Sequence, residues 1–383
     1  MALHFERSEF AARVERTCVE MAKRTLDGIL LFQQESMYYL TGYDTFGFCF
    51  FQCLYLRADG KMALLTRSAD LRQAQHTSTI EDIRIWTDAA GAQPASQLCD
   101  MIESLGGRGK RLGIENNSYG LTHFNGKAVD AAMDGFCSLI EATDLVNNVR
   151  LIKSTAELRY VRKAGALGDA ALKAAIRKTK AGNDEGEILA AQQGAIFAGG
   201  GDYPANEFII GSGHDALLCR YKSGRRKLSK NDQLTLEWAG VYRHYHAAFM
   251  RTIIIGKPSK QHRLMDAAAR EALHEVEQVL MPGYTAGDVF AAHSRVMDGH
   301  GMKQHRLNAC GYSLGAKFTP SWMDMPMFFQ GNQAEIKPNM VFFAHMILMN
   351  SEANRAFCLG RTYIITQGKP ESVSKQSLGL IVR

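Results

Sequence analysis

The segment LTLEWAGVYRHYHAAFMRT, residues 234–252, carries more reactive side chains than a pair of strands requires. Its pattern predicts two strands joined by a short turn, and it contains one carboxylate, Glu237, and two histidines, His244 and His246. Because side chains alternate between the two faces of a strand, His244, His246 and Ala248 are expected on one face. Glu237, across the turn, is expected to point into the same space as His246.

Glu237 and His246 are residue types that enzymes use to move protons. Glu237 is assigned as a general base, or as a nucleophile on an electron-poor carbon. The alternative is a structural ion pair with Arg251 or Arg220, because a lone buried carboxylate is costly. His246 is assigned as a proton shuttle at neutral pH, with a hydrogen-bonded structural histidine as the alternative. His244, near the turn, and Arg251 are assigned to substrate binding.

Four residues outside the hairpin complete the predicted site. His345 lies in the apolar run MVFFAHMILM, residues 340–349, and is either catalytic or packed in the core. Tyr312 can donate a hydrogen bond to a developing oxyanion, or form part of the wall. Arg220 suits bidentate binding of a substrate carboxylate, and Tyr221 beside it is also assigned to substrate binding.

The eight cysteines are scattered, with neither a CxxC pair nor a Cys/His zinc spacing. In a chain of this size they predict reduced, mostly buried thiols. Cys219 directly precedes Arg220. One neighbouring arginine is weak evidence for an activated thiolate, so Cys219 is not assigned as a nucleophile.

Composition and charge favour a globular protein with a small anionic or zwitterionic partner. The 383 residues are 46% hydrophobic and 22% charged, with a formal net charge of +6. No apolar run is long enough to span a bilayer, and the first residues carry charges where a signal peptide is apolar. We therefore predict a cytoplasmic protein that does not bind membranes. Nucleic acid is not an expected partner, because the basic residues form no stripe interleaved with aromatics.

The alternation of helical and strand patterns predicts two domains. Residues 1–150 alternate between helical segments, such as 5–26, and buried strands, such as DGILLF and MALLTR, which predicts a small α/β domain. Residues 151–383 begin with a predicted N-cap at Ser154 or Thr155 and a long amphipathic helix. Further helices then mix with antiparallel strand pairs, which predicts an α+β domain.

Six segments occur in the order and spacing of one superfamily: LTGYDTFG, LVNNVRLIKSTAELRYVRKAG, FIIGSG, the 234–252 hairpin, CGYSLG and IKPNMVFF. The chain therefore resembles the creatinase/prolidase/methionine-aminopeptidase superfamily, the M24 family, over nearly its whole length. The resemblance implies a small N-terminal domain of creatinase type, a catalytic domain of pita-bread fold with a curved antiparallel sheet, and a homodimer.

The metallopeptidases of this superfamily bind two metal ions through five ligands, and the resemblance locates each ligand position in this chain. The two aspartate positions fall on Glu237 and Ala248, and the histidine position falls on Tyr312. The two glutamate positions fall on His345 and near Gly360. A two-metal site needs several bridging carboxylates, and only one of these five residues has one. The residue set therefore predicts that no catalytic metal binds.

The superfamily also has metal-free members, creatinase and ectoine hydrolase, which hydrolyse C–N bonds. The segments GYSLGAKFTPSW and LEWAGVYRHYHA are similar to those of ectoine hydrolase. The chain differs from creatinase, because Arg220 replaces the catalytic histidine of that enzyme and Met250 stands near the position of one of its glutamates. The resemblance implies a metal-independent hydrolase, without a cofactor, of a C–N bond in a small carboxylate-bearing amidine, amide or guanidino compound. Three alternatives stay open: an Xaa-Pro type metallopeptidase with an unusual ligand set, a non-catalytic pita-bread binding protein, and a lyase.

Overall fold

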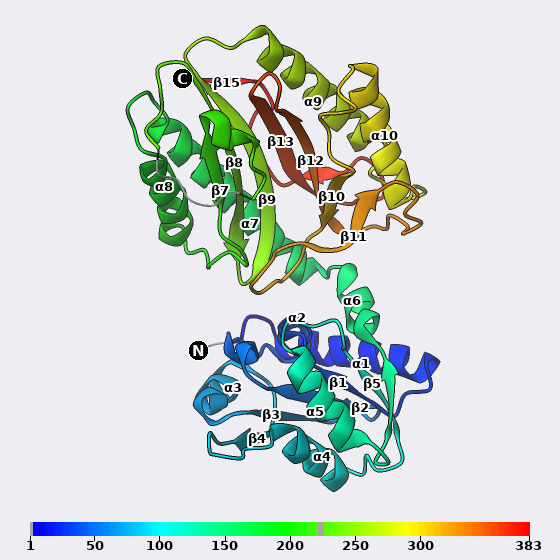
Figure 1. The fold of residues 1–383 in the computed structure, drawn as a ribbon. Coiled ribbons are helices and arrows are strands. Elements are labelled where there is room, and N and C mark those ends of the chain that lie inside the picture. The colour runs from blue at the N-terminus through cyan, green and yellow to red at the C-terminus, as the bar shows by residue number, and fades with distance from the viewer. Residues whose placement is uncertain (1–2, 221–225) are drawn as a thin grey trace. The chain divides into compact units, whose positions relative to one another are not determined.

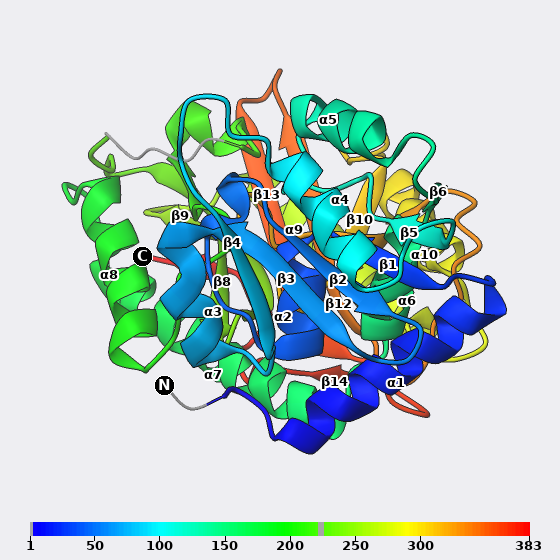
Figure 2. The same cartoon turned by 90° about the horizontal axis from the view of Figure 1, so that it is seen from below.

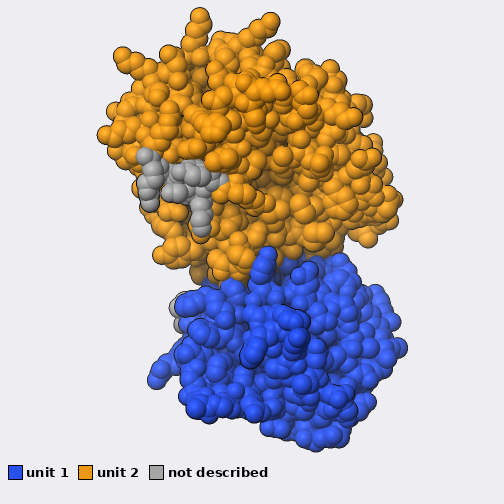
Figure 3. Space-filling view, in the orientation of Figure 1, with its two compact units in different colours: residues 1–150 blue, residues 151–383 orange. Residues whose placement is uncertain are grey.

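A computed structural model describes residues 3–220 and 226–383 of the chain. The chain separates into two compact units, Met1–Arg150 and Leu151–Arg383 (Figure 1, Figure 3). Tyr221, which the sequence assigns to substrate binding, lies outside the described residues. Within the described ranges, no helix is both long enough and apolar enough to cross a membrane.

The first unit is an α/β domain with one six-stranded sheet. Its elements are α1 (Arg7–Lys23), β1 (Gly28–Leu31), α2 (Gln34–Thr41), η1 (Gly47–Cys49), β2 (Cys53–Arg57), β3 (Met62–Arg67), η2 (Ser68–Asp70), α3 (Leu71–Thr77), β4 (Asp82–Trp86), α4 (Pro94–Ser104), β5 (Arg111–Ile114), α5 (His123–Met133), β6 (Ser138–Glu141) and α6 (Thr143–Leu151). The strand order β4-β3-β2-β1-β5-β6 can be followed in Figure 2. The predicted helix over 5–26 and the predicted strands DGILLF and MALLTR correspond to α1, β1 and β3.

Helices cover both faces of this sheet, because its strands are apolar on both sides. Leu30 of β1 belongs to a core shared with α4 and α5. Its neighbours Ile29 and Leu31 belong to a second core, shared with α1, α2, α3 and α6. Successive side chains of a strand point to opposite faces, so a continuous apolar run fills both cores.

The second unit is built on a larger, mostly antiparallel sheet. Its elements are α7 (Thr155–Lys178), α8 (Glu185–Ala198), β7 (Ile209–Ser212), η3 (Gly213–Leu217), β8 (Asp232–Tyr242), β9 (Tyr245–Ile255), α9 (Lys260–Val279), α10 (Ala286–Gly299), β10 (Ala309–Ser313), β11 (Asp324–Phe329), β12 (Val341–Asn350), β13 (Arg355–Ile364), β14 (Glu371–Ser372) and β15 (Ile381–Val382). The main strand order is β11-β10-β12-β13-β9-β8-β7, with β14 paired to β13 and β15 paired to β9. Figure 1 shows α9 and α10 beside the β10–β13 end of this sheet and α7 near β8 and β9.

Three helices pack on one face of this second sheet. A Cβ atom at Gly240 of β8 would lie 1.9 Å from the backbone oxygen of Ala164, so only glycine allows α7 to approach this closely. The indole nitrogen of Trp238 donates a hydrogen bond to the carbonyl oxygen of Gly168 on the same helix, at 3.0 Å. Alternate residues of β12, such as Phe342, pack in one core with α9 and α10. The intervening residues of these strands therefore point to the opposite face.

Two local signals set the ends of the elements that hold the site. The hydroxyl of Ser154 accepts a hydrogen bond from the backbone nitrogen of Glu157 at 3.2 Å, and the Glu157 carboxylate accepts one from the backbone nitrogen of Ser154 at 2.8 Å. This capping box confirms the predicted N-cap and begins α7. Arg243 and His244 join β8 to β9 with φ values of 52° and 63°, as a two-residue hairpin turn requires.

Candidate active site

The face of the second sheet opposite α7, α9 and α10 collects the predicted site residues from several strands. Glu237 of β8 pairs with Met250 of β9, and Met250 pairs with Gly360 of β13. Gly360 pairs in turn with His345 of β12. Residues directly opposite each other share a face of the sheet, so these four positions form one row across it.

Tyr312 of β10 reaches Glu237 from the far side of the sheet. Strands β12, β13 and β9 lie between β10 and β8, so in a flat sheet their backbones would be roughly 19 Å apart. The hydroxyl of Tyr312 nevertheless donates a hydrogen bond to Oε1 of Glu237, at 3.4 Å. The sheet must therefore curl around this face, and the site lies in the resulting concavity.

A tryptophan orients the hydroxyl of Tyr312. Nε1 of Trp322, in the segment between β10 and β11, donates a hydrogen bond to Oη of Tyr312 at 2.9 Å. An indole nitrogen can only donate, so the phenol oxygen accepts this bond and directs its own proton at Glu237. The sequence predicts no role for Trp322. It lies in an irregular segment, where no periodic pattern predicts a contact with the tyrosine ten residues earlier.

The surroundings of Glu237 change the pKa of its carboxyl group. Burial raises the pKa of this carboxyl to about 7, although the positive charge of Arg220 and the hydrogen bond from Tyr312 act in the opposite direction. A carboxyl group with a pKa near 7 can both accept and release a proton at neutral pH. Burial and the charge of Glu237 raise the pKa of Tyr312 well above its ordinary value, so the phenol stays protonated.

His345 lies beside Tyr312 in the concavity. The ring centroids of His345 and Tyr312 are 5.8 Å apart, and the ring of Phe343 is equally near His345, at 5.4 Å. Burial lowers the pKa of His345 to about 3, with the charges of His293 and Arg220 acting in the same direction. Its Nδ1 atom is buried without a hydrogen-bond partner among the described residues. Buried polar atoms are normally paired, so this neutral imidazole can bind a polar atom of a substrate.

A cavity of about 20 Å³ is lined in part by Glu237. Its walls come from Met250, from Cys358 of β13 and from the segment after β7, including Cys219. This volume holds roughly one water molecule, so a nucleophilic water fits beside the carboxyl group. Burial and the charge of Glu237 raise the pKa of the Cys219 thiol, which argues against a thiolate nucleophile there.

Arg220 follows Cys219 and supplies positive charge to the concavity. Its charge acts on Glu237, Tyr312 and His345 alike, so the guanidinium group lies near all three. Its side chain is exposed, and Nη2 lies 4.0 Å from Sδ of Met323. An exposed guanidinium group near a partly buried carboxyl group is well placed to bind an anionic group of an incoming substrate.

His246 shares this face, but the predicted approach to Glu237 is not found. His246 pairs with Val241, four residues along β8 from Glu237, so the strand rise separates the two positions by roughly 13 Å. Nε2 of His246 accepts a hydrogen bond from the backbone nitrogen of Ala205 at 3.0 Å, and burial lowers its pKa to about 3. The alternative of a hydrogen-bonded structural histidine fits this geometry, because register as well as face sets the distance between two residues.

Two residues assigned to substrate binding make contacts that do not involve Glu237. His244, in the turn, stacks on Phe318 with the ring centroids 4.2 Å apart. Arg251 follows the residue that pairs with Glu237, so alternation places its side chain on the opposite face of the sheet. There its Nη2 donates a hydrogen bond to the carbonyl oxygen of Ser377 at 3.1 Å. The alternative ion pair between Arg251 and Glu237 is therefore not formed.

Two protein families match the sequence of this chain. Residues 159–367 match metallopeptidase family M24, and residues 13–152 match the creatinase/prolidase N-terminal domain. The chain therefore belongs to metallopeptidase family M24. It is a hydrolase of that family with an N-terminal α/β domain and a catalytic domain of pita-bread fold, which confirms the predicted fold class.

Individual relatives differ in the reactions that their names record. An ectoine hydrolase from Halomonas elongata is 26% identical over 360 residues, which cover 89% of this chain and 90% of that protein. An Xaa-Pro dipeptidase from Pyrococcus furiosus is 22% identical over 332 residues, covering 86% and 88%. The solved structure of a prolidase from Thermococcus sibiricus has a TM-score of 0.88 at 19% identity and covers 98% of this chain and 99% of its own. At that identity the structural likeness establishes the fold alone.

The residues at the positions that the resemblance assigns to metal ligands do not fit a two-metal centre. Ala248 and Gly360 have no ligating side-chain atoms, and of the remaining three positions only Glu237 supplies a carboxylate. Among residues 3–220 and 226–383, no three His, Cys, Asp or Glu side chains are grouped so that they could hold a metal ion. Hard divalent ions bind chiefly through carboxylate oxygens, so we derive no reaction step through a metal.

Proposed function

We propose that the protein is a metal-independent hydrolase of a C–N bond in a small carboxylate-bearing amidine, amide or guanidino compound. The observation that carries this proposal is the state of Glu237. It is the one carboxylate among the five metal-ligand positions, its pKa is raised to about 7, and Tyr312 donates a hydrogen bond to it. Similarity to an ectoine hydrolase over most of both chains supports the same reading.

In the proposed reaction, Glu237 acts as a general base on water. It accepts a proton as the water oxygen bonds to the electron-poor carbon, and an electron pair of the C=O or C=N double bond moves to the oxygen or nitrogen. Protonated Glu237 is a weaker acceptor, so the hydroxyl of Tyr312 can turn to the developing negative charge. Glu237 then returns its proton to the leaving nitrogen as the C–N bond breaks, which leaves the carboxylate ready for another cycle.

Arg220 and His345 are proposed to bind the substrate around this centre. The guanidinium group of Arg220 holds the substrate carboxylate, which places the reacting carbon above Glu237. The neutral imidazole of His345 forms a hydrogen bond with a polar atom of the substrate, because its low pKa excludes a stable imidazolium at neutral pH. A small anionic or zwitterionic compound is the expected substrate.

The first test combines metal content with activity. The protein is purified without added metal, its metal content is measured, and turnover of cyclic amidines, N-acyl amino acids and guanidino acids is followed with and without chelator. We expect turnover that chelator does not reduce, with metal well below one ion per chain. Stoichiometric metal and chelator-sensitive cleavage of Xaa-Pro dipeptides would restore the metallopeptidase alternative. Absence of turnover together with tight association with a protein partner would favour a binding protein.

A further inference from the structure

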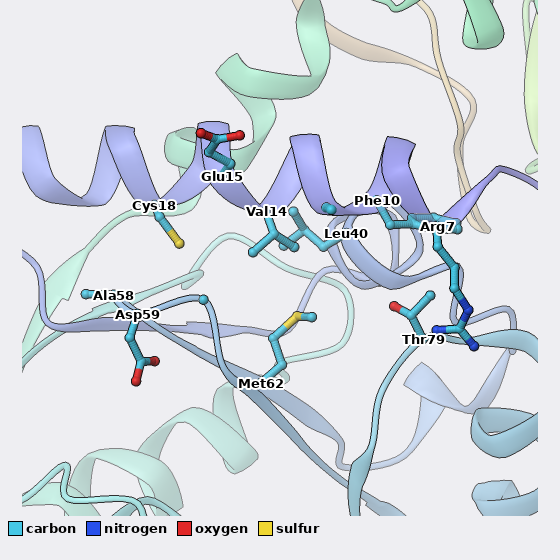
Figure 4. Close-up of a pocket in the computed structure, with 12 residues that line it drawn as sticks. Arg7, Phe10, Val14, Glu15, Cys18, Leu40, Ala58, Asp59, Met62 and Thr79 are labelled. Carbon is cyan, nitrogen blue, oxygen red and sulfur yellow. The ribbon is translucent and has the colours of Figure 1, made fainter.

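The first unit contains a cavity of about 490 Å³ that the proposed hydrolysis does not use (Figure 4). It lies between α1 and the hairpin formed by β2 and β3, with one wall from α2. Its size falls within the range of roughly 300–1,000 Å³ that is usual for small-molecule sites. All of its lining residues belong to the first unit.

The cavity is an elongated groove along one face of α1. The helix contributes residues 7, 10, 11, 14, 15 and 18, a spacing that returns to the same face of a helix with every turn. Cys18 lies eleven positions after Arg7, which corresponds to a length of roughly 16 Å. A ligand that fills this groove is therefore longer than it is wide.

The middle of the groove is apolar. Phe10 and Val14 of α1 line it from one side, and Leu40 of α2 and Met62 of β3 complete the wall, as Figure 4 shows. The sulfur of Cys18 also points into the groove. Burial raises the pKa of this thiol, so it adds a neutral surface.

The two ends of the groove differ in charge. Arg7 lies at one end, with its guanidinium group beside the side chain of Thr79 (Figure 4). Arg7 is exposed and makes no ion pair or hydrogen bond with the described residues. Asp59 stands toward the other end and is paired with Arg57, Nη2 to Oδ2, at 3.0 Å, and the carboxylate of Glu15 points away from the groove (Figure 4). The charge of Arg7 therefore makes its end of the groove the one that attracts an anionic group.

We propose that this groove binds a small monocarboxylate with an elongated apolar body. The carboxylate binds Arg7 and the hydroxyl of Thr79, and the apolar body lies between the side chains of α1 and those of Leu40 and Met62. This site is separate from the concavity around Glu237, and the proposal does not depend on the hydrolysis proposed there.

Calorimetric titration of the full-length protein with hexanoate, octanoate and decanoate tests the apolar part. We expect one molecule bound per chain and an affinity that rises roughly fourfold for each added methylene group, because each methylene leaves water. Ala11→Phe, which fills the groove from α1, should abolish the binding. Val19→Phe, at an exposed position of α1 outside the groove, should leave it unchanged.

Arginine variants test the charged end and separate the two sites. Arg7→Met should weaken octanoate binding at least tenfold and leave octanol binding unchanged, whereas Arg72→Met, an exposed arginine of α3, should alter neither. Undiminished octanoate binding by Arg7→Met or by Ala11→Phe would overturn the proposal. Loss of octanoate binding in Arg220→Met, with full binding in Arg7→Met, would place the bound carboxylate in the concavity around Glu237. That result would also overturn the proposal. An affinity that does not depend on chain length would also contradict it.

Discussion

Glu115 in the first unit is fully buried and Glu237 in the second is partly buried, and burial raises the pKa of each carboxyl to about 7. Their partners are nevertheless different. Glu115 accepts hydrogen bonds from the backbone nitrogens of Phe32 and Gln33, at 2.9 and 2.7 Å, and from the hydroxyl of Ser36, at 2.6 Å. Among the described residues, Glu237 accepts one long hydrogen bond, from a tyrosine at 3.4 Å, and it lines a cavity.

This difference separates a structural carboxyl group from a catalytic one. The three donors to Glu115 belong to the start of α2 and the residues just before it, so the carboxyl group joins that helix to the end of β5. Glu237 instead lines a cavity that has room for a water molecule. A raised pKa shows only that burial disfavours the ionised carboxylate. The hydrogen-bond donors and the space around the carboxyl group indicate whether it can exchange its proton with a substrate.

The strongest test replaces each carboxyl group by an amide. Glu237→Gln should lower kcat at least 10³-fold and leave the unfolding temperature within a few degrees, because it removes the base and few contacts. Glu115→Gln should leave kcat near that of the native protein and lower the free energy of unfolding by about 1–3 kcal/mol, because its amide group cannot accept all three hydrogen bonds. Both effects are measured by the turnover rate and the thermal unfolding of each variant. Equal losses of activity in the two variants would contradict the assignment of Glu237 as catalytic and Glu115 as structural.

The hydroxyl of Tyr312 should have the next largest effect. Tyr312→Phe should lower kcat about 10²-fold and move the acid limb of kcat/KM to higher pH. The direction follows because the hydrogen bond from Tyr312 lowers the pKa of Glu237, and its loss raises that pKa. Trp322→Phe should shift the limb in the same direction by a smaller amount. Tyr245→Phe is a matched control, because this buried tyrosine donates to Glu157 at 2.8 Å, away from the site, and should not move the limb.

Arg220 and Arg251 distinguish the two faces of the catalytic sheet. Arg220→Met should raise KM by about 10- to 100-fold with a smaller change in kcat, because it removes the group proposed to bind the substrate carboxylate. Arg251→Met should leave KM unchanged and lower the unfolding temperature. Steady-state kinetics on the substrate found in the panel provide the measurement. A large change of KM in Arg251→Met, without one in Arg220→Met, would mean that the active protein does not have the β8–β9 register that places Arg251 on the opposite face.

The smallest expected effect is on the pH dependence of stability. The pKa of Glu237 in the folded protein, about 7, exceeds its ordinary value, so its stabilising effect is present at acid pH and is lost as pH rises through 7. His246 has the opposite sign, because its folded pKa of about 3 is below its ordinary value and stability is lost as pH falls from about 6.5. Glu237→Gln should therefore flatten the decline in unfolding temperature between pH 4.5 and about 7, the ordinary and the folded pKa of this carboxyl. An unchanged slope of unfolding temperature against pH would show that ionising Glu237 does not destabilise the folded protein.

The candidate site was predictable only in part from the sequence. The resemblance assigned His345 and Glu237 to ligand positions of one site, and the strand register places both on one face of the sheet. His246 was expected beside Glu237, but a shared face gives no distance, and the register separates them. Trp322 was missed, because its contact with Tyr312 depends on the path of an irregular segment.

The sequence by itself determined the features that arise from neighbouring residues. The capping box of Ser154 and Glu157 and the apolar run of β12 are readable without a structure. The metal-ligand positions at Ala248 and near Gly360 required, in addition, the resemblance to a known family. Only the tertiary structure decided that the hydroxyl of Tyr312 meets Glu237, 75 residues away. That contact requires the sheet to curl, and the curl is the summed twist of many strand pairs packed on helices, which no local pattern encodes.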